Sequence, residues 1–181
     1  MYVLLTTSLR PNPRIRNFCK DLASTSLIFY YHTRGKMNIL SLFSYASSIK
    51  ANRVWIVYSR HGNPGMINFF NLDRNEKIGA IFIKGVTLKR ELSNVYSKST
   101  KNNSIKLFLE DEKLKGLYEL IKLAISSEEI FSSENITRIE ISKNKEGLAE
   151  IKFIDDKTNL LCGPKVIVKG YIKEDKVEFF N

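Results

Sequence analysis

The sequence predicts an α/β fold in which mixed sheets pack against helices. In the first half, short apolar runs rich in β-branched residues alternate with amphipathic patterns of helical period, and the last third contains hairpin patterns. The 181 residues are 43% hydrophobic and 11% aromatic, which is enough to build a packed core. The sequence has no run of about 18 apolar residues and no leader pattern, so we expect a soluble, cytoplasmic protein without a membrane segment.

The first strand and helix are the clearest local prediction. Residues 2–7 are apolar or β-branched and are followed by Pro11 and Pro13. Asn12 can cap a helix in which Pro13 occupies the first position. Apolar residues then recur at intervals of three and four, at Ile15, Phe18, Cys19 and Leu22.

One more helix and four more strands are predicted up to residue 90. Strands are predicted at 26–31 and 53–58, and the helix between them buries Ile39, Leu42, Phe43, Ala46 and Ile49. Short connections between successive strands and helices predict parallel strands. A loop over residues 59–65 then leads to an antiparallel pair, 66–72 and 78–90, added to the same sheet.

A polar stretch at about 93–104 is the predicted linker between a basic half, 1–92, and a near-neutral half, 105–181. In the second half we expect a strand at 105–109 and a helix at 111–126. The buried positions of that helix are Leu114, Leu117, Tyr118, Ile121 and either Ala124 or Ile125. Two hairpins follow, pairing 136–142 with 148–154 and 164–172 with 177–180. One interpretation is that the second half is an abbreviated copy of the first, although the sequence contains no internal repeat.

The positive charge is concentrated in the first half. The net charge is +10, and residues 1–98 hold 15 Lys and Arg against four acidic residues, whereas the remainder holds 14 basic and 15 acidic residues. Lysines that only maintain solubility would be spread along the chain. The many arginines of the first half instead favour phosphate, because the planar guanidinium donates paired hydrogen bonds. The sequence therefore predicts a first half that binds a polyanion.

Three basic segments are expected to meet at the carboxyl edge of the predicted parallel sheet, where backbone amides and helix dipoles favour phosphate oxygens. Each segment taken alone is also compatible with an ordinary solvated turn. The segments are the turn after the first strand (Ser8, Arg10, Arg14, Arg16), the loop before the second helix (Arg34, Gly35, Lys36) and the loop after the third strand (Arg60, His61, Asn63).

The sequence offers little support for catalysis. His32 and His61 are the only histidines, and Cys19 and Cys162 have no spacing that could build a zinc site, so we expect inert thiols. Neither GxxxxGK[ST] nor GxGxxG occurs. We therefore predict a non-enzymatic protein without metal or cofactor. Six aromatic residues could stack on bases, but their strand positions favour core packing: Phe29, Tyr30, Tyr31, Trp55, Phe69 and Phe70.

Five motifs, in order along nearly the whole chain, resemble the Brix-domain family of ribosome-biogenesis proteins in its short archaeal form. They are TTSLRPNPRIRNFCKDL (6–22), RGKMNILSL (34–42), RHGNPGMINFFNL (60–72), IGAIFIKGVTLKREL (78–92) and CGPKVIVKGY (162–171). The resemblance implies one Brix-like domain over 1–181. It also implies two structurally related halves, each resembling the anticodon-binding domain of class II aminoacyl-tRNA synthetases.

The resemblance further implies a non-catalytic factor that binds ribosomal RNA or its precursor during processing and subunit assembly. The cations that we expect to bind phosphate are Arg10, Arg14, Arg16, Lys20, Arg34, Lys36 and Arg60, with Lys89 and Arg90 as further candidates. One alternative is a scaffold that docks a ribosomal or assembly protein through strand edges at 136–142 or 177–180. Another is a small-molecule phosphate enzyme that uses the loop from Arg60 to Gly65.

Overall fold

The computed structural model describes residues 2–92, 104–125 and 135–180, in which eleven strands form one mixed sheet. The elements of the first half are β1 (Tyr2–Thr7), α1 (Pro13–Ala23), β2 (Phe29–Tyr31), α2 (Ile39–Ser48), β3 (Ala51–Arg60), β4 (Asn63–Asn71), β5 (Glu76–Thr87) and the 3₁₀ helix η1 (Lys89–Glu91). The elements of the second half are β6 (Ser104–Leu109), the 3₁₀ helix η2 (Glu112–Leu114), α3 (Lys115–Ile125), β7 (Ile136–Lys143), β8 (Ala149–Asp155), β9 (Leu160–Leu161), β10 (Lys165–Lys173) and β11 (Lys176–Phe179).

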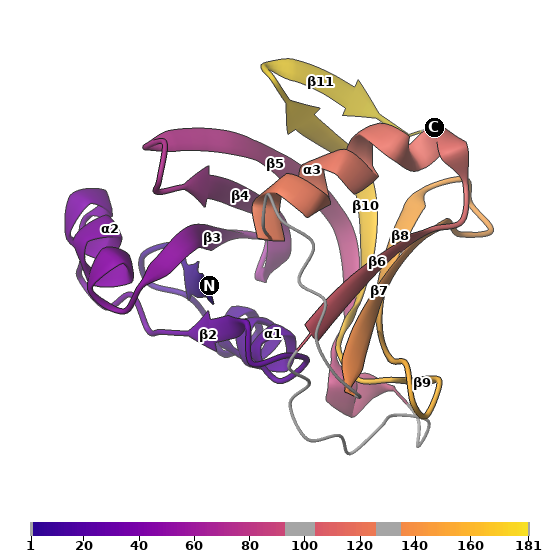
Figure 1. Cartoon of the computed structure of the whole chain (residues 1–181), viewed down its shortest axis with the longest axis horizontal. Helices are drawn as coiled ribbons and strands as arrows, with labels where there is room; N and C mark the ends of the chain where they lie inside the picture. Colours follow the sequence, from indigo (N-terminus) through magenta and orange to yellow (C-terminus); the bar gives the residue numbers. More distant parts are fainter. Residues whose placement is uncertain (1, 93–103, 126–134, 181) are drawn as a thin grey trace.

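The strand order is β2-β1-β3-β4-β5-β10-β8-β7-β6, with β9 beside β8 and β11 beside β10. As predicted, β1 is parallel to both β2 and β3, and β4 and β5 continue the sheet in antiparallel fashion. The antiparallel pair β5–β10 joins the strands of the two halves, and the far end of the sheet is the parallel pair β6–β7. Figure 1 shows that the sheet bends, with α1 and α3 inside the bend.

The first helix begins as its sequence predicts. The Asn12 side chain accepts a hydrogen bond from the Ile15 amide at 3.0 Å, and Pro13 occupies the first turn. All four residues of its predicted apolar stripe are fully buried: Ile15, Phe18, Cys19 and Leu22. The second helix begins in the same way, because Asn38 accepts a hydrogen bond from the Ser41 amide at 2.8 Å.

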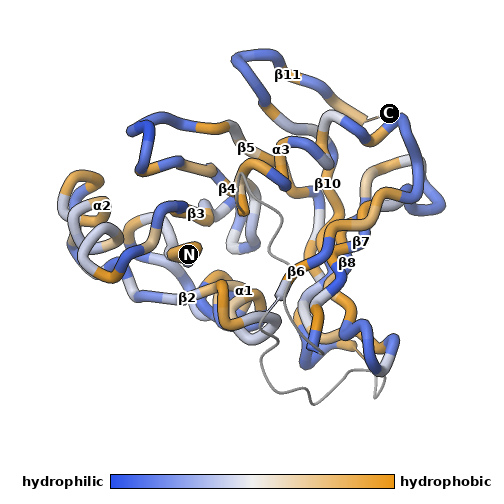
Figure 2. Tube along the Cα trace, viewed as in Figure 1, coloured by the Kyte–Doolittle hydropathy of each residue, from blue (hydrophilic) through white to orange (hydrophobic). Residues whose placement is uncertain are grey.

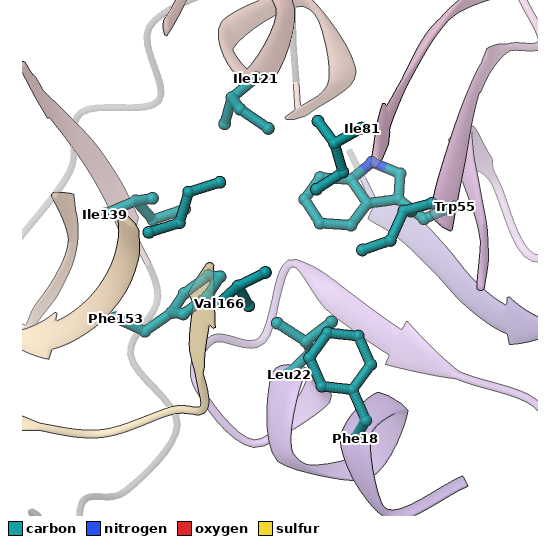
Figure 3. Close-up of a pocket in the computed structure, with 10 residues that line it drawn as sticks. Phe18, Leu22, Trp55, Ile81, Ile121, Ile139, Phe153 and Val166 are labelled. Carbon is teal, nitrogen blue, oxygen red and sulfur yellow. The ribbon is translucent and has the colours of Figure 1, made fainter. Parts of the chain in front are cut away.

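The main core lies inside the bend of the sheet and draws residues from both halves. At its centre, a cavity of about 10 Å³ is scarcely large enough for one water molecule. Figure 3 shows Phe18 and Leu22 of α1, Ile121 of α3, and Trp55 and Phe153 from opposite parts of the sheet around this space. The two halves therefore share one hydrophobic core.

Two side chains of β3 bind the end of α3 directly. Trp55 Nε1 donates to the Ala124 carbonyl at 2.8 Å, and Arg53 Nε donates to the Leu123 carbonyl at 3.0 Å. These bonds satisfy carbonyls near the helix C-terminus, which have no partner within the helix. Trp55 and Arg53 thus orient α3 against the first-half strands.

A second, smaller core lies on the other face of the sheet under α2. Leu42 and Ala46 of α2 pack there with Leu4 of β1 and with Val54 and Ile56 of β3. Figure 2 shows hydrophilic turns at the periphery between β4 and β5 and between β10 and β11, whereas apolar stretches of α1 and α3 face the interior.

Several sequence predictions need correction. The expected loop at 59–65 is instead a tight β3–β4 hairpin, in which His61 and Gly62 both have positive φ, at 48° and 80°, and strand pairing resumes at Asn63. Such angles fit the twist of a two-residue hairpin. Pro64 is accommodated because the register shifts between Tyr58 and Ser59.

Other differences concern the limits and neighbours of strands. The second strand is only Phe29–Tyr31, and the predicted strand over 78–90 ends at Thr87 before η1. The expected edge at 136–142 is wrong, because β7 is paired on both sides, with β6 and β8. The predicted linker falls almost wholly outside the described residues, since β6 begins at Ser104.

Truncating the main core should be costly. Phe18→Ala removes a fully buried ring, and we expect it to lower the free energy of unfolding by about 3–5 kcal/mol. Urea unfolding measures the change. Leu40→Ala is the control, because Leu40 is 74% exposed, and its effect should stay within about 0.5 kcal/mol. Equal effects of the two substitutions would contradict this view of the core.

Candidate nucleic-acid interface

Three segments that follow β1, β2 and β3 lie side by side at the carboxyl ends of these strands. The Ser8 amide donates to the Val57 carbonyl at 2.8 Å, and the His32 amide donates to the Leu5 carbonyl at 3.0 Å. The Asn12 side chain also donates to the Gly62 carbonyl at 2.7 Å and so ties the start of α1 to the β3–β4 hairpin. The structure thus brings together the three predicted basic segments at one edge of the sheet, here called the cationic edge (residues 8–16, 32–38 and 60–63).

The helix termini add to the positive potential of this edge. Both α1 and α2 begin there, each after a capping asparagine, and neither has an acidic residue in its first turn. The N-terminal amides of a helix carry partial positive charge and favour anions. In addition, the sequence contains no Asp or Glu at all between Asp21 and Asp73.

Six of the nine predicted cations are available to a ligand. The structure gives none of these six side chains a hydrogen bond or ion pair to another described residue. Arg16 is half-buried and the other five are exposed: Arg10, Lys20, Lys36, Arg60 and Arg90.

The remaining three predicted cations serve the fold. Arg14 forms a two-pronged ion pair with Glu91 of η1 and donates to the Val86 carbonyl at 3.1 Å. Arg34 is 9% exposed and its Nε donates to the Met37 carbonyl at 3.0 Å. Lys89 Nζ donates to Ser24 Oγ at 3.2 Å. The sequence could not separate these roles, because only tertiary contacts distinguish a free cation from a paired one.

The Arg14–Glu91 pair has a clear electrostatic signature. The hydrogen bond from Arg14, supported by the Leu88 amide, lowers the pKa of Glu91 below its usual value. The two side chains are only about one-third exposed and join the start of α1 to η1.

The cationic edge continues into a small aromatic surface that the sequence analysis had assigned to the core. Tyr30 is 46% exposed, whereas its neighbour Phe29 is buried. The His32 and Tyr45 rings lie 4.2 Å apart between centroids, and interaction with the Tyr30 hydroxyl raises the pKa of Tyr45. The sequence did contain a signal for this, because successive side chains of a strand point to opposite faces of the sheet, so Tyr30 points away from the face on which Phe29 is buried.

The outer face of the second half is electrically balanced. Glu150 accepts hydrogen bonds from Lys152 and Lys165, each at 3.1 Å, and Lys152 also pairs with Glu140. Burial alone raises the pKa of Glu150, but the two lysines outweigh burial and lower the pKa below its usual value. Second-half lysines are therefore largely neutralised on this face.

Other parts of the described structure are weaker candidates for a ligand-binding site. A cleft of about 380 Å³ near the starts of β3 and β5 mixes Arg53, Arg74 and Lys77 with Asp73, Glu76 and Glu174, so it has no single sign of charge. Within residues 2–92, 104–125 and 135–180, no three His, Cys, Asp or Glu side chains are grouped to hold a metal ion. None of the described helices could cross a membrane.

Both cysteines are free and buried, as expected for inert thiols. Burial raises the pKa of Cys19, and it raises that of Cys162 to about 11.

The fold and the cationic edge define an α/β protein suited to a polyanion. No family model matches the chain. A Brix domain-containing ribosomal biogenesis protein described as probable, from Aeropyrum pernix, is 40% identical over 90 residues, which are 48% of this chain and 50% of the relative. A protein of the same description from Thermococcus kodakarensis is 35% identical over 92 residues, 50% of this chain and 44% of the relative. The matched part of the chain thus spans about half the length of these curated relatives.

Two solved structures have the same fold. A probable ribosomal biogenesis protein from Aeropyrum pernix matches with a TM-score of 0.81 at 24% identity over 99% of both chains. An archaeal Imp4-like protein, Mil, matches with a TM-score of 0.66 at 21% identity over 94% of this chain and 99% of its own. The predicted resemblance to archaeal Brix-domain proteins is confirmed in sequence, and the α/β fold is confirmed in structure.

Arg14 should matter more to stability than its neighbour. We expect Arg14→Ala to lower the free energy of unfolding by about 1 kcal/mol, because it removes a partly exposed ion pair and a hydrogen bond to Val86. Arg16→Ala, which breaks no such contact, is the control and should have little effect. Urea unfolding of the two variants tests the assignment, which fails if the order is reversed.

Stability should also fall in acid. The folded pKa values of Glu91 and Glu150 lie below the usual 4.5, so their stabilisation is complete above about pH 4.5 and disappears as the pH falls through the lower folded values. Glu150→Gln should therefore be less stable at pH 7 and should lose less on acidification. Thermal unfolding from pH 7 to 3 measures this, with exposed Glu146→Gln as control. An unchanged acid slope in Glu150→Gln would contradict it.

Proposed function

We propose that the chain is a non-catalytic ribosome-biogenesis factor of the Brix family that binds ribosomal RNA or its precursor through the cationic edge. The names of its relatives and the shared fold support the biogenesis role. The observation that carries the RNA assignment is the set of six unpaired cations, four of them on the cationic edge, within a half where no acidic residue lies between Asp21 and Asp73.

Phosphate contact fits this arrangement better than base readout. Four of the available cations (Arg10, Arg16, Lys36 and Arg60) are on turns or near the start of α1, where backbone amides also point outward, whereas Lys20 is in the last turn of α1. Such contacts position a nucleic acid and carry no sequence information. The folded edge therefore serves to hold a structured RNA, and further groups are needed to select a particular one.

We also propose that the domain consists of two related halves, 1–92 and 105–181. The series β1-β3-β4-β5 and the series β6-β7-β8-β10 each contain one parallel pair followed by two antiparallel pairs, which supports the proposal. Among residues 104–125 and 135–180, the second series shows no counterpart of β2 and α2, in keeping with an abbreviated copy. Their shared core means that the halves fold as one unit.

The alternative role, a scaffold for a ribosomal or assembly protein, finds one supporting feature in the second half. Within the part of the chain that the structure describes, β11 pairs only with β10, and its Val177 and Phe179 are more than half exposed. An edge strand with exposed apolar residues can accept a further strand.

Reversing charge at the cationic edge should weaken RNA binding. The triple variant Arg10→Glu, Arg16→Glu, Arg60→Glu should lower the affinity for a structured ribosomal RNA fragment and reduce the slope of log K against log salt by about 2–3, roughly one per lost phosphate contact. Fluorescence anisotropy over a salt series measures both. Arg14 and Arg34 are left intact because they support the fold.

The matched control is Lys145→Glu, Lys157→Glu, Lys176→Glu, which changes the charge equally at exposed sites of the second half. Its affinity should fall less and its salt slope should stay near that of the parent. Equal losses in both variants would show a nonspecific charge effect and refute the assignment to the edge. If the second-half variant alone lost binding, the proposal would also fail.

A further inference from the structure

Tyr30, His32 and Tyr45 form a small aromatic shelf at the free side of β2. Among the described strands β2 pairs only with β1, and Tyr30 stands opposite Leu4, which packs under α2, so Tyr30 faces the α2 side of the sheet. There it is close enough to Tyr45 of α2 to affect the pKa of that side chain, and the Tyr45 ring centroid lies 4.2 Å from that of His32. The three side chains come from two elements and the loop after β2, so the fold itself places them together.

The charge around the shelf favours an anionic ligand. No carboxylate occurs from residue 22 to residue 72, a stretch that contains all three rings. Exposed Lys36 lies in the same loop as His32, only four residues on, and α2 begins just after it with no acidic residue in its first turn, so the positive end of its dipole is not neutralised by a carboxylate. Gly35 between them has a φ of 59° and open space around it. The shelf therefore contains no acidic side chain and is bordered by positive charge.

We propose that this shelf stacks an unpaired base of single-stranded RNA while neighbouring cations hold the adjoining phosphates. Surfaces for single-stranded nucleic acid combine aromatic rings for bases with basic groups for the backbone. The packing of the His32 ring against Tyr45 and the pairing of β2 with β1 hold the rings in place before binding, so little side-chain freedom is lost on binding. A protein partner that bound through charge would need carboxylates to pair with the cations around the shelf. Such a partner would not explain why the aromatic rings are arranged for stacking.

This inference rests on the proposed RNA binding and adds a preference for unpaired segments. The phosphate contacts of the cationic edge accept duplex and single-stranded RNA alike, whereas a stacked base must be free of its partner. The shelf would then direct the protein toward a junction between helical and single-stranded RNA.

The experiment compares two RNA probes of about ten nucleotides, a single strand and a duplex, at fixed salt. The variant Tyr30→Ala, His32→Ala should bind the single strand about 5- to 100-fold more weakly, the range for loss of one stacked base, and should bind the duplex as the parent does. The ring-preserving variant Tyr30→Phe, His32→Phe should retain most of the affinity. Tyr45 is left unchanged because it packs against the core under α2.

A second readout reports stacking itself. A single strand carrying 2-aminopurine should lose fluorescence on binding the parent and the Phe variant but not the Ala variant. Phe108→Ala is the matched control, because Phe108 is also 46% exposed but lies on β6 at the far end of the sheet. It should alter neither affinity nor fluorescence.

The outcomes separate the two proposals. If both RNAs bind the parent but the Ala variant binds the single strand normally, the shelf is refuted and the cationic edge stands. Equal weakening of duplex and single strand by the Ala variant would also refute stacking, since it would indicate a general loss of structure. If the parent binds neither RNA with a salt-dependent affinity, the proposed function itself fails, and the shelf fails with it.

Discussion

The rest of the structure depends on one apolar core enclosed by the bend of the sheet. α1 from the first half and α3 from the second insert their buried faces into the same interior, and only a cavity of about 10 Å³ remains between them. Trp55 and Arg53 hold the end of α3 through its carbonyls. Close packing makes this arrangement rigid, because a packed interior cannot deform continuously. The packing of this core sets the positions of the described surface segments, including the cationic edge.

The cationic edge is a consequence of that packing. Since α1 must bury Ile15, Phe18, Cys19 and Leu22, its start is held at the carboxyl end of β1, next to the β3–β4 hairpin. The ion pair between Arg14 and Glu91 uses one of the first-half cations to fix α1 against η1. The cations that remain unpaired lie around this frame, so their spacing is set by the core and not by their own interactions.

Sequence reasoning succeeded where a local pattern had only one stable solution. The Asn12–Pro13 start of α1, its apolar stripe and the two second-half hairpins match the structure closely. It failed where a residue's role depended on the exact backbone path of its surroundings. The Gly62–Gly65 segment resembles an open turn, yet Gly65 is a strand residue whose added Cβ would lie 2.3 Å from the Cβ of Arg60. Arg34 resembles a surface cation, yet it is buried against the carbonyl of Met37.

The sequence by itself determined the α/β class, the parallel first three strands, the concentration of charge in the first half and the kinship with archaeal Brix-domain proteins. Periodicity, composition and local motifs indicate these features, and they can be recognised without knowing which residues are in contact across the chain. Only the tertiary structure decided that the strands form one continuous sheet through β5 and β10, which cations are free, and that Tyr30, His32 and Tyr45 meet. The physical reason is that pairing partners and burial are set by the packing of segments far apart in sequence.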